Sequence, residues 1–362
     1  GRRQRQMCIR DSFTSGASTI NLGHNHPRLV AARKKFNDEK RMMVWKTFLS
    51  PYLAALSHNL AQLSPGDLNY SFFCNSGSEA TEGAIKMARK YQGAKKKVIV
   101  YTDKGLHGTT HFALSVSGAV GEKTNQFKQF DDCVSIPWGD SAAFENLISQ
   151  HGGNQNDIAA IILEAVISDG SFLPPDDYLP NIRRLCDQNN ILLIIDEVTN
   201  GLGRTGKMFA FNHWNVSPDI FTLGKSVGGG KCSIAGYVAR KNIFKKAYGS
   251  MNDSTLHTTT FNGFGEECYT AIEALNILVE ENLVENAAAT GSYLGEQLEA
   301  LKESFPTSIK EVRGIGLLWA IDFFEQNQHH EDGSFVHNIC QKLFHQHNLS
   351  LIHISEPTRP ED

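Results

Sequence analysis

Residues 159–198, AAIILEAVISDGSFLPPDDYLPNIRRLCDQNNILLIIDEV, contain the pattern that decides the fold. Two continuous apolar runs, Ala159–Val166 and Ile191–Val198, predict strands that are covered on both faces. The segment between them, Asp176–Asn190, predicts an amphipathic helix whose buried face is formed by Leu179, Ile182, Leu185 and Cys186. A strand, a crossover helix and a second strand make a right-handed βαβ unit. We therefore expect an α/β fold around a mostly parallel sheet.

Outside this unit, short apolar runs continue to alternate with amphipathic stretches. Further strands are predicted at Lys97–Asp103, Pro218–Leu223 and Ile234–Val238. Helical patterns run from about Glu266 to Leu283 and over Ala287–Glu303. The alternation in Ile309–Phe324 predicts strands of a second, smaller domain.

The composition excludes several classes of protein. The 362 residues are 41% hydrophobic and 20% charged with a net charge of -4, which is ordinary for a globular protein. No apolar run approaches the roughly 20 residues that span a bilayer, and the mild acidity offers no basic surface for nucleic acid. The seven cysteines show no C-x-x-C spacing, so the sequence predicts neither a metal site nor a disulfide framework.

The two ends of the chain are expected to be adapter sequence rather than protein. Codons that Met7–Ser12 permits are the reverse complement of codons that Leu349–His353 permits, as an inverted DNA sequence flanking an insert would give. We therefore leave residues 1–12 and 349–362 out of the fold reasoning. On this interpretation both natural ends are missing, and a targeting signal would not be visible.

Carboxylates follow two of the predicted strands. Glu164 lies at the end of the first apolar run, and Asp196 and Glu197 lie at the end of the second. In open α/β sheets ligands bind beyond the carboxyl ends of the strands, where an acid can contact them. From strand position alone, an acid that only caps a following helix is an equal alternative.

The segment Phe72–Glu79 (FFCNSGSE) joins a predicted strand to a predicted helix. Ser76 and Glu79 fit a capping box. Free backbone N–H groups at Gly77 and Ser78, together with the positive end of the helix dipole, suit a phosphate. Many helices begin in this way without binding one.

Lys225 lies between glycines in Leu223–Gly230 (LGKSVGGG), just beyond a predicted strand. A partly buried lysine has a lowered pKa that suits Schiff-base chemistry; the alternative is a lysine on a surface loop.

Nearby, Gly201–Lys207 (GLGRTGK) matches G-x-G-x-x-G and most of a P-loop. We reject both nucleotide-binding readings because Met208 replaces the magnesium-binding hydroxyl and no helix is predicted there.

Two weaker candidates complete the set. His107 lies in Gly105–Gly108 (GLHG), where a lone histidine is more often structural than catalytic. The run Thr258–Thr260 is more often a strand edge than a phosphate site.

Together these features suit one ligand. A phosphate on a helix N-terminus, a lysine that captures a carbonyl and a carboxylate that faces a ring nitrogen are what pyridoxal 5′-phosphate (PLP) requires. At this point the sequence resembles the class III (subgroup II) PLP-dependent aminotransferases, in particular those that act on putrescine, ornithine and acetylornithine. The resemblance covers essentially all of residues 13–348. It is specific in GHNHP at 23–27, FFCNSGSEATEGAIKMAR at 72–89, IIDEV at 194–198, GLGRTGKMFA at 201–210, GKSVGGG at 224–230 and LHTTTF at 256–261.

The resemblance implies roles for the matching residues. Lys225 would form the Schiff base with PLP and later carry the proton between substrate and cofactor. Asp196 would pair with the pyridinium nitrogen and keep it protonated. Ser76, Gly77 and Ser78 would bind the phosphate.

The resemblance also implies contacts around the rest of the cofactor. His107 would lie beside the ring, and Glu164 would lie near the cofactor at its strand end. Thr259 and Thr260 belong to the segment that, in the family, reaches the cofactor phosphate of the partner subunit. The active site would then lie at a homodimer interface.

The sequence departs from the family on the cofactor face and the substrate side. Leu106 replaces the aromatic residue that stacks on the ring, and Thr199 replaces a glutamine that contacts the ring hydroxyl. The segments Glu164–Gly170, which includes Asp169, and Asn262–Gly265 also differ from the family pattern. These departures put the substrate in question more than the cofactor.

The resemblance implies PLP-dependent transferase fold type I. The expected domains are an N-terminal segment of the small domain at 13–45, the PLP-binding large domain at 46–270 and an incomplete α+β small domain at 271–348. The expected function is ping-pong transfer of an amino group from a diamine or ω-amino acid to a 2-oxo acid, 2-oxoglutarate first, in a cytoplasmic homodimer without nucleic-acid or membrane partners. The alternatives are a PLP-dependent epimerase or decarboxylase and a non-catalytic homologue, which would need neither Lys225 nor Asp196.

Overall fold

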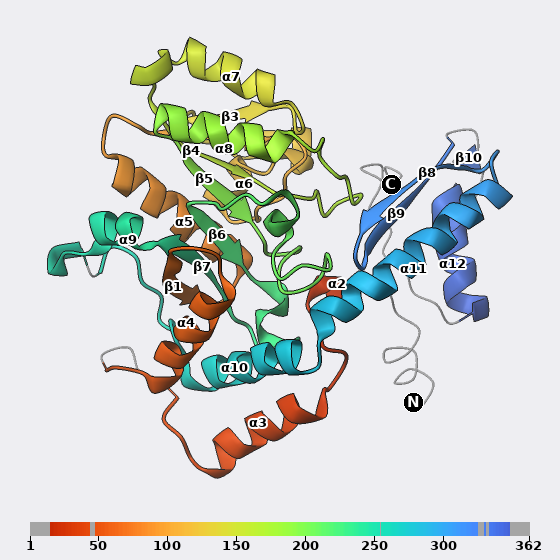
Figure 1. Cartoon of the computed structure of the whole chain (residues 1–362), viewed down its shortest axis with the longest axis horizontal. Coiled ribbons are helices and arrows are strands. Elements are labelled where there is room, and N and C mark those ends of the chain that lie inside the picture. The colour runs from red at the N-terminus through yellow and green to blue at the C-terminus, as the bar shows by residue number, and fades with distance from the viewer. Residues whose placement is uncertain (1–14, 44–47, 254, 325–328, 331–332, 348–362) are drawn as a thin grey trace.

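The structure is a computed structural model that describes residues 15–43, 48–253, 255–324, 329–330 and 333–347. The predicted adapter segments, 1–12 and 349–362, lie outside the described residues. Figure 1 shows a large body built around a twisted sheet and a smaller body beside it, which contains the last described part of the chain.

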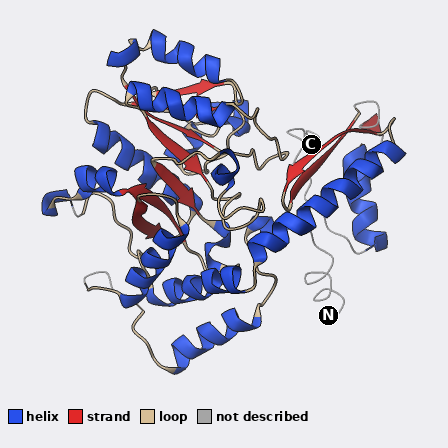
Figure 2. Cartoon of the chain, in the orientation of Figure 1, coloured by secondary structure: helices blue, strands red, loops and turns tan. Residues whose placement is uncertain are grey.

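The large body is organised by a seven-stranded sheet with the spatial order β1-β7-β6-β5-β4-β2-β3. Strands β3, β2, β4, β5 and β6 are parallel, whereas β7 is antiparallel to both β6 and β1. The expected mostly parallel sheet is therefore confirmed (Figure 2). The strands are β1 (Leu68–Cys74), β2 (Val98–Thr102), β3 (Cys133–Ile136), β4 (Ile158–Leu163), β5 (Leu192–Asp196), β6 (Ile220–Leu223) and β7 (Ala235–Arg240).

Helices cover both faces of this sheet (Figure 1). The α-helices are α2 (Ser15–Ser18), α3 (Pro27–Asp38), α4 (Pro51–Leu63), α5 (Gly77–Gln92), α6 (His111–Ser115), α7 (Ser141–Gln150), α8 (Tyr178–Asn189), α9 (Lys241–Tyr248), α10 (Gly265–Glu280), α11 (Leu283–Ser304) and α12 (Phe335–His347). Short 3₁₀ helices are η1 (Gly118–Gln126), η2 (Gly153–Gln155), η3 (Ala210–Trp214), η4 (Lys225–Gly228) and η5 (Met251–Asp253). Across the described ranges, no helix is long and apolar enough to cross a membrane.

The continuous apolar runs of the sequence correspond to a sheet with a core on each face. In β4 and β5, Ile161, Leu163, Leu193 and Ile195 belong to one core, which also contains the predicted apolar face of α8. The alternate residues Ala160, Ile162, Leu192 and Ile194 belong to the other core, together with Ala84, Ile85 and Ala88 of α5. Successive side chains of a strand point to opposite faces, so a strand between two helix layers must be apolar at every position.

The predicted βαβ unit is confirmed, but its strands are shorter than predicted. β4 ends at Leu163 rather than Val166, and β5 ends at Asp196 rather than Val198. The apolar pattern continues past both ends because the following turns are also buried, and burial alone does not distinguish a buried turn from a strand. Helix α8 ends where Asn190 adopts the left-handed conformation (φ 50°).

The smaller body contains the hairpin β8 (Ile309–Ile315) and β9 (Leu318–Phe323), which packs against α11. A second short hairpin, β10 (His329–His330) and β11 (Gly333–Ser334), leads into α12. The strands predicted within Ile309–Phe324 are thus confirmed.

Two of the predicted domain limits can be compared with the helices of the structure. The limit at 270/271 falls inside α10, which is continuous, whereas the chain breaks at Asn282 (φ 52°) before α11. The described part of segment 13–45 packs on α10 through ion pairs such as Arg28–Glu273 and Arg33–Glu266. A helical period cannot show which body a helix joins, and we propose Asn282 as the limit between the two bodies.

Candidate active site

The carboxyl ends of three neighbouring strands bring predicted site residues to one edge of the sheet. Glu164 directly follows β4, Asp196 is the last residue of β5, and only Gly224 separates Lys225 from β6. The register of β5 and β6 pairs Asp196 with Thr222. This is the edge at which open α/β sheets bind their ligands.

Asp196 is a buried carboxylate with three hydrogen-bond donors. Its Oδ2 lies 2.7 Å from His107 Nδ1, and its Oδ1 accepts from Thr222 Oγ1 and from the Val198 N–H, each at 2.9 Å. Burial raises the pKa of the Asp196 carboxyl, but the bond and charge of His107, with the other two donors, bring this pKa below its ordinary value. Asp196 therefore keeps its negative charge, as a partner for a pyridinium nitrogen must.

Glu164 has the opposite tendency. Its Oε1 accepts from the Leu106 N–H at 3.0 Å, and its Oε2 accepts from the Ser168 N–H at 3.1 Å. Burial, and after it the nearby charge of Asp196, raise the pKa of Glu164 above its ordinary value. Glu164 thus ties two loops to the sheet edge, and Leu106 lies on one of them with its side chain 43% exposed.

Lys225 is half-buried, and its amine has a defined partner. Its Nζ donates a hydrogen bond to Thr199 Oγ1 at 2.7 Å. Burial lowers the pKa of the Lys225 amine, although the charges of Asp196 and Glu164 oppose this. A lysine with a lowered pKa is a better nucleophile and proton carrier at neutral pH.

The predicted phosphate turn has the expected capping box. Ser76 Oγ accepts from the Glu79 N–H at 3.3 Å, and Glu79 Oε2 accepts from the Ser76 N–H at 3.0 Å. The cap does not use the N–H groups of Gly77 and Ser78, which begin α5. Gly108 lies against this turn so closely that a Cβ there would stand 2.4 Å from Ser78 Oγ. The turn is therefore positioned beside the loop that carries His107.

No hydrogen bond in the described part of the chain joins the threonine run to Lys225 or Asp196. Thr260 is exposed and Thr259 is half-buried. His257, just before the run, packs on Phe72, with ring centroids 4.5 Å apart.

The sequence did not indicate Thr222 as part of the site, and it placed Glu197 among the strand-end carboxylates without giving it a role of its own. Thr222 is a buried polar residue inside an apolar strand. A polar residue in such a run was the feature of the sequence that could have pointed to the site. Glu197 is 1% exposed and accepts from the N–H groups of Ala210 and Phe211 at 2.9 and 3.1 Å. Glu197 thereby holds the chain just after Gly201–Lys207. Residues 201–207 themselves form turns and no helix, as expected when the nucleotide-binding motifs were rejected.

Glu197 should make stability depend on pH. Burial raises its pKa from 4.5 to about 8 despite the two N–H donors. A carboxyl whose pKa is raised by folding stabilises the fold below pH 4.5, and this contribution declines as the pH rises toward 8. The slope for one group is about 1.4 kcal/mol per pH unit. We expect urea unfolding at pH 5, 7 and 9 to show this decline, and Glu197→Gln to flatten it.

The exposed Glu122 provides a matched control for this prediction. Glu122→Gln should leave the pH dependence of the free energy of unfolding unchanged. Equal slopes for the wild type and Glu197→Gln would show that Glu197 is already ionised in the folded protein.

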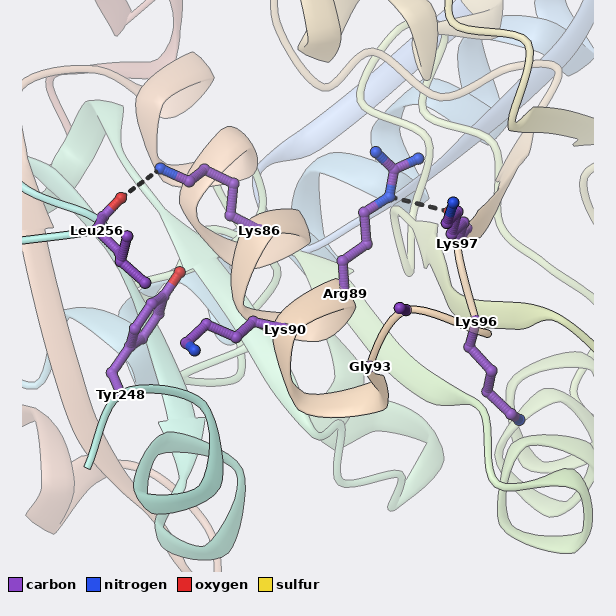
Figure 3. Close-up of a pocket in the computed structure, with 9 residues that line it drawn as sticks. Lys86, Arg89, Lys90, Gly93, Lys96, Lys97, Tyr248 and Leu256 are labelled. Atoms are coloured by element: carbon purple, nitrogen blue, oxygen red, sulfur yellow. Dashed lines mark hydrogen bonds between the residues drawn. The ribbon is translucent and has the colours of Figure 1, made fainter. Parts of the chain in front are cut away.

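A basic pocket of about 520 Å³ lies at the other end of α5 and is not part of the cluster. Figure 3 shows Lys86 directed at the Leu256 carbonyl oxygen (2.8 Å) and Arg89 at that of Lys97 (2.9 Å). Lys90 forms an ion pair with Asp253 at 3.0 Å. These cations already have acceptors and lie near a helix C-terminus, which favours positive charge, so they do not indicate a ligand.

Residues 11–352 match the family described as class-III aminotransferases. The chain belongs to the class III aminotransferase family, whose members use PLP, and it is a PLP-dependent aminotransferase with the type I fold. The match begins inside one predicted adapter segment and ends inside the other, so the adapter interpretation stays a prediction.

Solved structures of aminotransferases resemble this chain throughout. An (S)-enantioselective omega-transaminase from Thermomicrobium roseum is 30% identical, with a TM-score of 0.81, over 87% of this chain and 74% of that one. The taurine:2-oxoglutarate aminotransferase from Bifidobacterium kashiwanohense, in complex with PLP and glutamate, is 28% identical (TM-score 0.83; 94% and 80%). The ornithine aminotransferase from Toxoplasma gondii is 26% identical (TM-score 0.82; 94% and 77%).

The residues at the sheet edge fit PLP. A Cβ on Gly77 would lie 2.9 Å from Val198 Cγ1, so only glycine allows the phosphate turn to approach the loop after β5 this closely. His107 Nε2 is buried without a hydrogen-bond partner in the described residues. Lys225 offers a half-buried amine for the carbonyl, and Asp196 offers a buried charge for the ring nitrogen.

Proposed function

We propose that this aminotransferase takes an amino group from a diamine, with putrescine as the first candidate, and gives it to 2-oxoglutarate. The observation that carries the reaction is the sheet-edge cluster, in which the Lys225 amine donates a hydrogen bond to Thr199 beside the buried Asp196 carboxylate and its partner His107. An ω-amino acid is the second donor class. The structural neighbours support 2-oxoglutarate because one of them is a taurine:2-oxoglutarate aminotransferase.

Each residue has a distinct task in this proposal. Bound PLP withdraws electrons from the carbon that carries the substrate amino group, so that the carbon can release its proton. Lys225 Nζ would take that proton from the substrate carbon and pass it on to a carbon of the cofactor. Asp196, held by His107 and Thr222, keeps the ring nitrogen protonated. Ser76, Gly77 and Ser78 hold the phosphate end by the helix N-terminus.

Asp169 favours a diamine over an ω-amino acid. It is a half-buried carboxyl whose pKa is raised by burial, and it shows no ion pair within the described ranges. The adjacent Ser168 N–H bonds to Glu164, so Asp169 lies on a loop tied to the sheet edge. An acid without a partner attracts the second ammonium group of a diamine and repels the carboxylate of an ω-amino acid.

We also propose that the active enzyme is a homodimer in which Thr259 and Thr260 serve the partner's cofactor phosphate. Large apolar side chains are exposed beside this run, among them Met251, Leu256 and Phe261. Exposed apolar side chains gathered in one region are typical of protein interfaces. Thr260 is itself exposed, which suits a residue that reaches a second subunit.

The donor proposal is tested with the PLP-loaded protein and 2-oxoglutarate. Putrescine, ornithine and 4-aminobutyrate are offered separately, and glutamate formation is measured, with light scattering on the same sample to give the mass in solution. We expect the highest kcat/KM with putrescine and the mass of a dimer. Asp169→Asn should lower kcat/KM for putrescine about 10- to 100-fold, as expected for loss of one desolvated ion pair.

4-Aminobutyrate is the internal control, because it brings no second ammonium to Asp169. Asp169→Asn should not lower its kcat/KM and should tend to raise it, because the substitution removes a repulsion of the 4-aminobutyrate carboxylate and no attraction. Equal losses for both donors would contradict the role of Asp169. Faster turnover of ornithine or 4-aminobutyrate than of putrescine would reject the diamine donor while leaving the aminotransferase intact.

A further inference from the structure

Thr199 is a position at which the sequence departs from its family, and the structure places it directly against Lys225. Lys225 Nζ donates to Thr199 Oγ1 at 2.7 Å. Among the described residues, the Lys225 amine makes no other hydrogen bond. A threonine side chain is shorter than the glutamine expected from the resemblance, and its hydroxyl meets the amine.

Both partners stand on fixed backbone. The loop of Thr199 is anchored by the Val198 N–H, which bonds to Asp196, and by Asn200 Nδ2, which donates to the Val166 carbonyl oxygen at 2.6 Å. Lys225 has a φ of 43°, a strained left-handed conformation for a residue with a side chain. Strain of this kind persists only where the surrounding structure holds it, so the fold sets the direction in which the Lys225 side chain leaves the backbone.

Neither of the nearby acids, Asp196 and Glu164, accepts a hydrogen bond from the Lys225 amine in the described part of the chain. The Asp196 oxygens are bonded to His107, Val198 and Thr222. The Glu164 oxygens are bonded to two backbone N–H groups. Both acids attract the lysine by charge at a distance, but the group in contact with the amine is a neutral hydroxyl.

A hydroxyl suits an amine that changes its protonation state. The protonated amine has donors only, and a hydroxyl oxygen can accept from it. The neutral amine has a free electron pair, and a rotated hydroxyl can donate to it. An ionised carboxylate has no proton to donate, so it could not bond to that electron pair.

We propose that Thr199 is a positioning residue that holds the Lys225 amine in both protonation states, an inference that rests on the proton-carrying role of Lys225 proposed above. In the step concerned the substrate C–H bond breaks and an N–H bond forms on Lys225 Nζ. The electron pair of the C–H bond stays on the substrate carbon, from which the bound cofactor withdraws it. The Thr199 hydroxyl changes from donor to acceptor as the amine gains the proton.

The test compares Thr199→Val, which removes the hydroxyl but keeps the branched shape, with Thr199→Ser, which keeps the hydroxyl. PLP-free protein is labelled with an amine-acylating reagent from pH 6 to pH 11, and peptides containing Lys225 are quantified by mass spectrometry. The exposed Lys310 gives the reference rate. We expect the Lys225 midpoint to fall by about half to one pH unit in Thr199→Val, because an acceptor for the ammonium is lost. Thr199→Ser should keep the wild-type midpoint.

Turnover gives the second readout. With PLP and the best donor, kcat of Thr199→Val should fall about tenfold while KM changes less than twofold, because the hydroxyl acts on the proton transfer and not on substrate binding. Thr199→Ser should recover most of kcat. A Lys225 midpoint that Thr199→Val leaves unchanged, or that Thr199→Ser shifts equally, would overturn the proposal. A wild-type protein that fails to hold PLP would refute the role of Lys225 instead, and the labelling of PLP-free protein would still decide that of Thr199.

Discussion

Lys225→Ala is expected to abolish the reaction. The variant should lack the absorption band of PLP bonded covalently to the protein, and glutamate formation should fall by about 10⁴- to 10⁶-fold, as when other enzymes lose the residue that bonds to their substrate or cofactor. The alanine removes the amine that captures the cofactor and the group that carries the proton. The spectrum and the rate are both measured with added PLP, because the phosphate turn remains able to hold the cofactor weakly.

Lys241→Ala is the matched control, since Lys241 is an exposed lysine at the start of α9. It should leave both the band and the rate unchanged. The far-ultraviolet circular dichroism of Lys225→Ala should equal that of the wild type, because a half-buried side chain beyond a strand end supports little of the core. A band of undiminished strength in Lys225→Ala would mean that another amine of the chain binds PLP.

Asp196→Asn is expected to lower kcat by about 10²- to 10⁴-fold, the range for removal of one acid–base group. The amide carries no negative charge, so it cannot keep a ring nitrogen protonated. It also changes the partner of His107, whose Nδ1 lies 2.7 Å from the carboxylate in a buried position. The loss should appear in kcat with PLP at saturation, and PLP should also bind more weakly in an equilibrium titration.

The exposed Asp176 provides the control for this charge. Asp176→Asn should have no effect on kcat or on PLP affinity. The melting temperature separates the two effects of Asp196→Asn, because a lower melting temperature with full activity would make Asp196 a structural partner of His107 only. Full activity and an unchanged melting temperature together would remove Asp196 from the site.

Local patterns in the sequence were sufficient for much of the fold. The apolar runs of β4 and β5 are buried on both faces, and the period of α8 marks its buried side, because strand and helix periods determine which side chains face a core. The capping box at Ser76 was predictable because all its atoms lie within four residues. Lys225 could be singled out because a lysine between glycines beyond a strand is unusual.

Other parts of the site depend on residues far apart in the chain. His107 and Asp196 are 89 positions apart, and no periodicity gives the register that brings them to 2.7 Å. The same holds for Thr199 and Lys225, and for Thr222, which meets Asp196 only because β5 and β6 pair in one register. The limit that we propose at Asn282 rests on the left-handed backbone of that residue, across which the predicted helical pattern runs on to Leu283.

The sequence by itself determined which residues have the chemistry for an aminotransferase and which segments form strands and helices, because both are properties of nearby residues. Only the tertiary structure decided in which direction the pKa of each acid shifts and what the lysine amine contacts. Those outcomes depend on burial and on distances between strands, and these are set when the parallel sheet brings the ends of β4, β5 and β6 together.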